Sequence, residues 1–541
     1  MYNRGLFHDW VPKPLMLLLI IFMLIVLLFI NPIYSANVGL MVGSTGIISE
    51  YFMWGIFAQT IGLGGGLPLI MRLKMRFRSK ELMITALIVM ALMSVVIATT
   101  HSAGVIVGAC LIFGFVKMSA MAEIVLPMRA ILSPKNDNGR FYSLFYPIAI
   151  GLGQIGVMIS AKFTQNVEWQ MVHIYTAALL FACALLCVIV MHNKHFMEPM
   201  PLTNMDWSAV VLFMGSLLCF SYVVTFGKQQ DWFNSPNIRF CTIGAVVLAV
   251  ILVVRGLKLK NPLIKFGIYN IGSVRLGLVL LVGQGILLSA ASVQTIYSSA
   301  ILGYSWANNA YLGMMMMTGI ITAGVVAFFW TKHHIPLRMY VFTGFAAYII
   351  YYTILYFKMV PGLNIESFML PQFFNGYAMC SLFIAVWIHI VAKIPQKDMI
   401  YSVAPLMVFR SVISITLFSG IVSWFQYKFQ LESVANLAVG FDGIFMASNP
   451  EAGSLSSVQL GALLAANKKL LGYIIIIGFA FLTFILFHQF GDFKYKIGYY
   501  YSRNHHHKEE NSLEDEKTGG SIVGVVNSYI FNIFHLKQKG K

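Results

Sequence analysis

Long apolar stretches recur along the whole chain and are separated by short polar segments. A helix that crosses the hydrocarbon core of a membrane needs about 20 mostly apolar residues. The pattern therefore predicts an all-α integral membrane protein. The fourteen expected transmembrane helices are 15–42, 47–71, 81–100, 103–128, 141–162, 171–192, 207–227, 237–256, 272–301, 307–331, 337–358, 366–393, 402–427 and 469–490.

Composition narrows the class of protein further. Hydrophobic residues make up 58% of the 541 residues, and only 11% are charged. A soluble domain carries about 25% charged residues, so the chain is neither a soluble enzyme nor a disordered chain. The six cysteines lie in apolar stretches without the CxxC spacing of a zinc or redox site, which indicates buried free thiols rather than a disulfide scaffold.

Basic residues give the expected orientation. The chain has 37 Lys and Arg against 20 Asp and Glu, a net charge of +17. The basic residues gather in alternate polar segments, at 72–80, 129–140, 255–275 and 494–508. The positive-inside rule then puts both termini in the cytoplasm, and membrane topology explains the excess charge better than nucleic-acid binding does. The long polar segment 428–466 is expected on the opposite side of the membrane.

Sequence motifs of the common hydrolases are absent from the chain. It contains no GxxxxGK[ST], no HExxH and no GxSxG sequence. We therefore expect no nucleotide-driven or catalytic function, no cofactor and no metal. In the tail 491–541, the apolar stretch 522–536 is compatible with a helix lying on the inner leaflet or with a disordered segment.

A few polar residues lie inside the apolar stretches, where they are costly and usually face a bundle interior or a water path. Lys117 and Glu123 are six residues apart on one expected helix, so they point about 120° apart and lie about 9 Å apart along the axis. They cannot pair well with each other, and each is expected to meet a partner on another helix or to face a cavity. A proton-carrying role and a structural interhelical pair both remain open. Arg410 is expected to form a structural or gating pair, or to reach the headgroups.

Amide side chains and small residues suggest a pathway through the bundle. The amides line a polar path or form ordinary interhelical hydrogen bonds. Helix 47–71 is rich in Gly before Pro68, and helix 141–162 contains Pro147 and several glycines. This composition is typical of helices that move against each other or of helices in static close packing. The substrate-cavity candidates are Asn31, Asn37, Gln284, Gln294, Gln372 and Asn375.

Several short segments carry a family resemblance. They are Asp206-Trp207, Asp231-Trp232-Phe233-Asn234-Ser235, Asn261-Pro262-Leu263-Ile264, Arg410 and Gly151-Leu152-Gly153-Gln154-Ile155-Gly156. In order and spacing, residues 10–490 resemble the fourteen-helix drug:proton antiporters of the major facilitator superfamily. The resemblance is greatest to the multidrug exporters that work with a periplasmic adaptor, and the opening residues 5–14 resemble a Bacteroidetes-type subgroup.

The resemblance implies the domain organisation. A cytoplasmic N-terminus (1–14) precedes an N-terminal six-helix bundle (15–192). A linker with two extra transmembrane helices (193–271), a C-terminal six-helix bundle (272–490) and a cytoplasmic tail (491–541) follow.

It also implies the function: a non-enzymatic transporter of the inner membrane that exports hydrophobic or amphipathic small molecules by proton antiport and alternating access. Its partners would be the amphipathic cargo, protons and the lipid bilayer, with a periplasmic adaptor and an outer-membrane channel. The alternative is a dedicated exporter of a lipid, a siderophore or another amphiphile, with or without proton coupling.

The chain departs from the family pattern where coupling residues normally stand. Phe115 replaces an Arg, Pro32 replaces an Asp, and Met75 and Arg78 occupy the acidic and Gly positions of the loop after the second helix. We therefore assign proton coupling to Glu123 and Lys117. The remaining candidates are Arg410 and Arg76 for gating or an ion pair, and Gly151, Gly153, Gln154 and Gly156 for the antiporter-type motif, in which Leu152 replaces the usual Pro.

Overall fold

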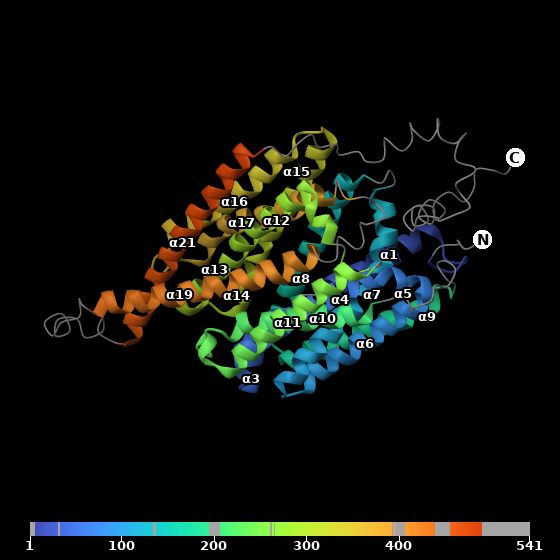
Figure 1. Cartoon of the computed structure of the whole chain (residues 1–541), viewed down its shortest axis with the longest axis horizontal. Coiled ribbons are helices and arrows are strands. Elements are labelled where there is room, and N and C mark those ends of the chain that lie inside the picture. The colour runs from blue at the N-terminus through green and yellow to red at the C-terminus, as the bar shows by residue number, and fades with distance from the viewer. Residues whose placement is uncertain are drawn as a thin grey trace.

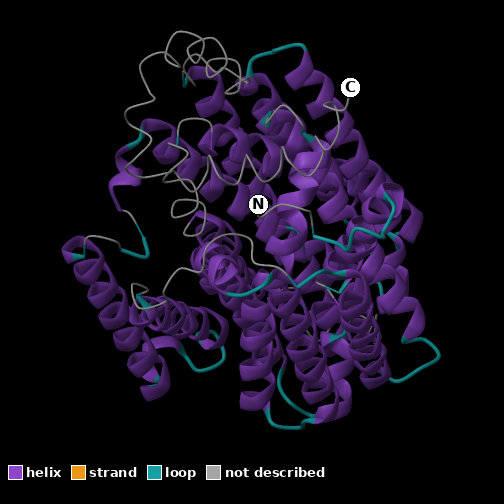
Figure 2. Ribbon diagram, turned by 90° about the vertical axis from the view of Figure 1, so that its right-hand side faces the viewer, coloured by secondary structure: helices purple, strands orange, loops and turns teal. Residues whose placement is uncertain are grey.

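A computed structural model gives the architecture. It describes residues 6–30, 33–133, 137–193, 206–259, 262–264, 266–391, 394, 406–438 and 455–488. Asn31 and the tail 491–541 lie outside the described residues. In the part of the chain that is described, the molecule consists of helices and loops without a strand (Figure 2).

The helices run roughly along a common axis (Figure 1). The α-helices of the first half and the linker are α1 (Lys13–Phe29), α2 (Ile33–Ala36), α3 (Val38–Thr45), α4 (Ser49–Gly66), α5 (Ile70–Arg76), α6 (Ser79–Thr99), α7 (Ala103–Leu132), α8 (Asn138–Phe163), α9 (Trp169–Val190), α10 (Trp207–Phe226) and α11 (Pro236–Lys258). Those of the second half are α12 (Gly272–Ala290), α13 (Ser292–Ile296), α14 (Trp306–Tyr311), α15 (Gly313–Lys332), α16 (Leu337–Lys358), α17 (Met369–Val391), α19 (Ile415–Ala438) and α21 (Leu455–Phe487). Short 3₁₀ segments include η1 (Leu67–Leu69), and two π-helical segments are η5 (Tyr297–Ile301) and η8 (Phe409–Ser414).

Thirteen described helical segments are long and apolar enough to cross a membrane. The expected helix 47–71 is the one outside this set, because Glu50, Gln59 and the glycines make α4 less apolar. It is nevertheless helical, and η1 and α5 continue it past Pro68 to Arg76. The architecture is the predicted all-α integral membrane fold.

The prediction of a long polar loop at 428–466 is largely wrong. α19 continues to Ala438, and α21 begins at Leu455 rather than near residue 469. The two helices stabilise each other beyond the apolar stretches, since Lys469 pairs with Glu432 at 2.8 Å and Gln426 donates to Asn467 at 2.7 Å. Apolar length marks what the membrane covers, whereas a helix continues as long as its backbone and neighbours support it.

Helices α1 to α9 form what we call the first bundle, and α12 to α21 form the second bundle. Most helices pack chiefly within their own bundle, whereas α8 lies at the interface and packs extensively on α15 and α17. Each bundle contains one very close helix crossing. In the first, Gly62 of α4 lies against the Leu111 carbonyl of α7, and Gly114 lies against the Gln59 carbonyl. No side chain larger than hydrogen fits at either glycine without moving backbone.

The second bundle repeats this crossing between α15 and α17. Gly319 lies against the Phe373 carbonyl, and Gly376 lies against the Met316 carbonyl. In both crossings each helix contributes one glycine and one contacted carbonyl. The glycine stands three positions after the residue whose carbonyl is contacted. The two bundles therefore share a helix-pairing rule, as expected for repeated halves.

Helices α10 and α11 form a hairpin beside both bundles. α10 contacts α4, where Trp54 donates to the Leu218 carbonyl at 3.2 Å, and it also contacts α19, where Gly420 lies against Val224. α11 packs mainly on α10, and few of its residues are buried. The hairpin thus lines one lateral side of the interface between the bundles.

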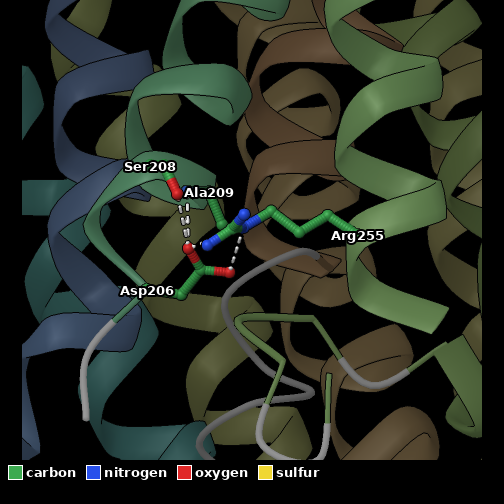
Figure 3. A network of polar contacts seen from close by, with 4 residues as sticks. All are labelled: Asp206, Ser208, Ala209 and Arg255. Atoms are coloured by element: carbon green, nitrogen blue, oxygen red, sulfur yellow. Dashed lines mark hydrogen bonds and ion pairs between the residues drawn. The ribbon is translucent and has the colours of Figure 1, made fainter. Parts of the chain in front are cut away.

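An ion pair joins the two ends of this hairpin (Figure 3). Arg255 near the end of α11 donates from Nε to both carboxylate oxygens of Asp206, at 2.9 and 3.0 Å. Asp206 also caps α10 by accepting from the Ala209 amide and the Ser208 hydroxyl. Burial alone would raise the pKa of Asp206, but these hydrogen bonds and the Arg255 charge outweigh burial and hold that pKa below its usual value.

Candidate functional site

The end of the molecule that carries Arg76, Arg129, Arg140 and Arg255 is called the basic face here. α4 runs toward this face and α8 runs away from it. The charged residues predicted to act lie between this face and the middle of the bundles, on α5, α7 and η8.

Glu123 of α7 has its partner on another helix, which is one of the two arrangements expected from the sequence. Its Oε2 lies 2.9 Å from Nζ of Lys74 on α5. Both side chains are buried, with 1% of Lys74 and none of Glu123 exposed, and Oε1 of Glu123 has no hydrogen-bond partner. Among the ion pairs of the described residues, this is the only one buried on both sides.

Lys117 lies on the same helix, α7, and is equally buried at 1% exposure. Its Nζ lies 6.0 Å from the centre of the Phe113 ring. The helical spacing separates it from Glu123 as the sequence indicated, and Glu123 pairs with Lys74 instead. The interior of the first bundle therefore holds two buried lysines and one buried carboxylate on α5 and α7.

Arg410 lies between the two bundles in a cage of aromatic rings. Its guanidinium carbon is 4.3 Å from the ring centre of Phe383, 5.5 Å from Trp387 and 5.7 Å from Tyr146. Nη1 donates to the Tyr146 hydroxyl at 3.2 Å. Tyr146 belongs to α8 of the first bundle, whereas Phe383 and Trp387 belong to α17 of the second, so Arg410 contacts both.

The expected ion pair of Arg410 is not formed with any described carboxylate. Arg410 is carried by η8, one of the two π-helical segments in the described chain. π-helical turns are rare and occur frequently at functional sites. Ser414 fixes the same segment to α12 by donating to the Leu281 carbonyl at 2.8 Å.

The amide candidates are spread over the interior rather than gathered at one point. Asn37 accepts from Ser160 at 3.1 Å, and Gln294 accepts from Tyr351 at 2.9 Å. Gln372 accepts from Asn375 at 3.2 Å. Gln284 is buried, and neither its amide oxygen nor its nitrogen has a partner. Asn37 and Gln294 thus make interhelical contacts, Gln372 and Asn375 pair within α17, and Gln284 is the one of these with unused hydrogen-bonding capacity on both atoms.

The glycine-rich motif of α8 makes less contact than its composition suggests. A side chain at Gly151 or Gly153 would meet no atom within 4 Å, while Gly156 is buried and Gln154 lies toward Gly313 at the start of α15. Close contact between the bundles occurs nearer the basic face, where Gly324 of α15 lies against Pro147 of α8. Arg76 is exposed at the end of α5 and pairs with no described residue.

A small cavity lies within the first bundle. It has a volume of about 20 Å³ and is lined by residues that include Tyr34, Cys110 and His173. Tyr34 Oη and His173 Nε2 have no hydrogen-bond partner there. This space suits about one water molecule rather than a cargo molecule.

Sequence reasoning missed the contact partners of two candidate residues. Lys74 was counted as a loop residue, because the apolar stretch of its helix ends near residue 71. The continuation of the helix through η1 and α5 was the signal that it lies inside. Tyr146 was missed because an aromatic residue in an apolar stretch carries no periodic signal of its own.

Comparison with known proteins gives distant relatives. No protein-family model matches the chain. It is 21% identical over 352 residues to the probable multidrug resistance protein EmrY of Escherichia coli K12, covering 63% of this chain and 66% of that protein. It is 22% identical over 251 residues to the multidrug export protein EmrB of the same organism, covering 45% and 47%. These matches thus span about half to two thirds of the relatives' lengths.

A solved structure shares the fold. A POT family transporter, crystallised in complex with a thioalcohol-conjugated peptide, aligns with a TM-score of 0.53 at 13% identity. The alignment covers 85% of this chain and 95% of that transporter. The chain is accordingly a multi-pass membrane protein with the major facilitator type of transporter fold.

Proposed function

We propose that this protein exports hydrophobic or amphipathic small molecules by alternating access, driven by protons that enter in exchange. The observation that carries the proposal is the buried Lys74–Glu123 pair. Ionisable residues inside a membrane domain are costly and typically mark ion or proton pathways. The names of the multidrug relatives EmrY and EmrB support export of small molecules.

Proton binding changes the interaction energy of this ion pair more than it changes the energy of any apolar contact. When Glu123 is charged it compensates Lys74, and when it takes up a proton the attraction between two buried opposite charges is lost. The lysine cation is then less stabilised, which favours release of its proton or a different arrangement. A buried carboxylate–lysine pair therefore couples proton occupancy to helix position, which alternating access requires. Lys117, on the same helix, is the second group of the proposed switch.

The geometry favours a distinct role for each part of the transporter. The two bundles, at 15–192 and 272–490, are the units that rock, and the hairpin α10–α11 follows them as an insertion. The basic face is the cytoplasmic side of the inner membrane, with both termini there. Arg410 closes the contact between the bundles on this side. Gly151, Gly153 and Gly156 become contact points in the opposite conformation. A periplasmic adaptor and an outer-membrane channel complete the export path.

Proteoliposomes test the proposal directly. A fluorescent amphipathic dye is loaded together with a pH-sensitive dye, and cargo movement and proton movement are followed for wild type, Glu123→Gln and Lys117→Met. Glu432→Gln is the matched control, since Glu432 also pairs with a lysine but is exposed. We expect dye-dependent proton flux in wild type and in the control, and none in the two variants.

Two outcomes would count against the proposal. Undiminished proton flux in both folded variants contradicts the assignment of the switch to α7. Dye movement without proton flux in wild type contradicts proton antiport and leaves transport by another coupling.

A further inference from the structure

The aromatic cage of Arg410 holds a positive charge inside the membrane domain. Tyr146 follows the start of α8 by eight residues, and Phe383 precedes the end of α17 by eight residues. At a rise of 1.5 Å per residue, both rings lie about 12 Å from those helix ends. The cage is therefore well below the level of the helix ends.

That charge is only partly compensated by the residues that the structure describes. An arginine in a protein does not lose its proton, so the guanidinium cannot become neutral as a lysine can. No carboxylate of the described residues lies within 4.0 Å of it. The three rings attract the cation through their faces, but they do not replace a counter-ion.

The hydrogen-bonding pattern leaves one edge of the guanidinium available. Nη1 donates to Tyr146, and this is the hydrogen bond that Arg410 makes with described residues. Nε is buried without a partner. The Nε–Nη2 edge is the fork that takes two oxygens of a carboxylate, sulfonate or phosphate side by side. The residue as a whole is half-buried, and Nε itself is enclosed in this conformation.

We propose that the Arg410 cage binds one anionic group of an amphiphile, through the Nε–Nη2 edge, with the apolar part of the amphiphile lying along the interface between the bundles. The proposal deepens the export function above and rests on it where the amphiphile is cargo. An anionic phospholipid headgroup offers the same chemistry from the bilayer. Two independent features support the site: the unused donor edge among the rings, and the π-helical turn η8 that presents it.

A matched pair of probes tests the site. Dansyl-undecanoic acid and its methyl ester differ only in the anionic group, and their dissociation constants are measured by fluorescence with the full chain in phosphatidylcholine nanodiscs. We expect wild type to prefer the acid. In Arg410→Met and Arg410→Gln, the ratio of the acid affinity to the ester affinity should fall about 10- to 100-fold, the size of a lost charge-assisted hydrogen bond.

Two further variants sharpen the result. Arg410→Lys keeps a charge but loses the fork, so an intermediate ratio is expected. Arg239→Gln removes an exposed arginine at the start of α11 and should leave the ratio as in wild type. Size-exclusion elution shows which variants fold, and Arg410→Gln, with a neutral polar side chain, serves as the neutral variant if Arg410→Met does not fold. An unchanged ratio in either folded neutral variant overturns the proposal.

Lipid composition and transport separate the sources of the anion. If phosphatidylglycerol in the nanodisc weakens acid binding in wild type but not in Arg410→Gln, the site takes the lipid headgroup. If it has no effect and the acid is exported from phosphatidylcholine proteoliposomes, the site takes cargo. Failure of wild type to export either probe, with the acid preference intact, contradicts the export function and not the anion site. Equal affinity of wild type for acid and ester contradicts the site and not export.

Discussion

A double-mutant cycle on Lys74 and Glu123 separates what this pair does for stability from what it does for transport. The perturbation is Glu123→Gln, Lys74→Met, and both together. Each single change removes one member of the contact while the other member stays buried, because the two side chains are 1% and 0% exposed. Breaking a buried ion pair in this way typically costs about 3–5 kcal/mol.

The double variant should behave differently. Removing both partners removes the cost of burying two charges, and here Oε1 of Glu123 has no hydrogen bond to lose. We therefore expect the double variant to be within about 1 kcal/mol of wild type, with a coupling energy of about 3 kcal/mol or more. At 1.4 kcal/mol per tenfold change, each single variant should raise the unfolding constant more than about 100-fold.

Denaturant unfolding in mixed micelles, followed by tryptophan fluorescence, measures the four free energies. The same four proteins are then assayed for proton flux in proteoliposomes. Restored stability with lost flux in the double variant is the expected combination, since the pair then matters for coupling rather than for folding. Additive single effects, with no coupling energy, would refute the reasoning from the 2.9 Å contact.

Two other predictions concern packing and pH. Gly114→Ala should destabilise by about 1–3 kcal/mol, because its Cβ would overlap the Gln59 carbonyl. Gly108→Ala in the same helix meets nothing within 4 Å and should be neutral or stabilising by up to about 1 kcal/mol, and equal melting temperatures for the two variants would contradict the close crossing. The pKa of Asp206 is held below its usual value in the folded protein, so its contribution is present above the unfolded pKa of about 3.9 and is lost as pH falls through the lower folded pKa. Arg255 is partly exposed, so this contribution is about 1 kcal/mol or less, and the melting-temperature difference between wild type and Asp206→Asn should shrink in acid.

Much of the fold could be predicted because the membrane requires it. Apolar runs of sufficient length must be helices in lipid, since no water is available to satisfy the backbone. Helix ends were less predictable, as α21 shows by beginning at Leu455, well before its apolar core. Polar contacts between neighbouring helices extend a helix in a way that apolar length does not record.

The site was predicted only in part. The burial of Glu123 and Lys117 follows from their position in an apolar stretch, and Glu123 was expected to meet a partner on another helix or to face a cavity. That the partner is Lys74 depends on a helix that continues through a 3₁₀ turn at Pro68. The surroundings of Arg410 depend on which faces of α8 and α17 pack against each other. The hydrophobic periodicity of either helix does not predict this tertiary pairing.

The repeated glycine crossings supply a residue-by-residue register between the two halves of the chain. Lys117 and Glu123 follow Gly114 by three and nine positions, and the residues at the same steps after Gly376 are Met379 and Ala385. If both halves descend from one duplicated ancestor, their paralogous positions have diverged in charge while keeping the crossing itself. At these two steps ionisable groups stand in only one copy, whereas the titratable His389 of α17 lies elsewhere on its helix. The two copies of one packing scheme have thereby become unequal at these steps: the first holds a lysine and a glutamate, and the second keeps the same positions apolar.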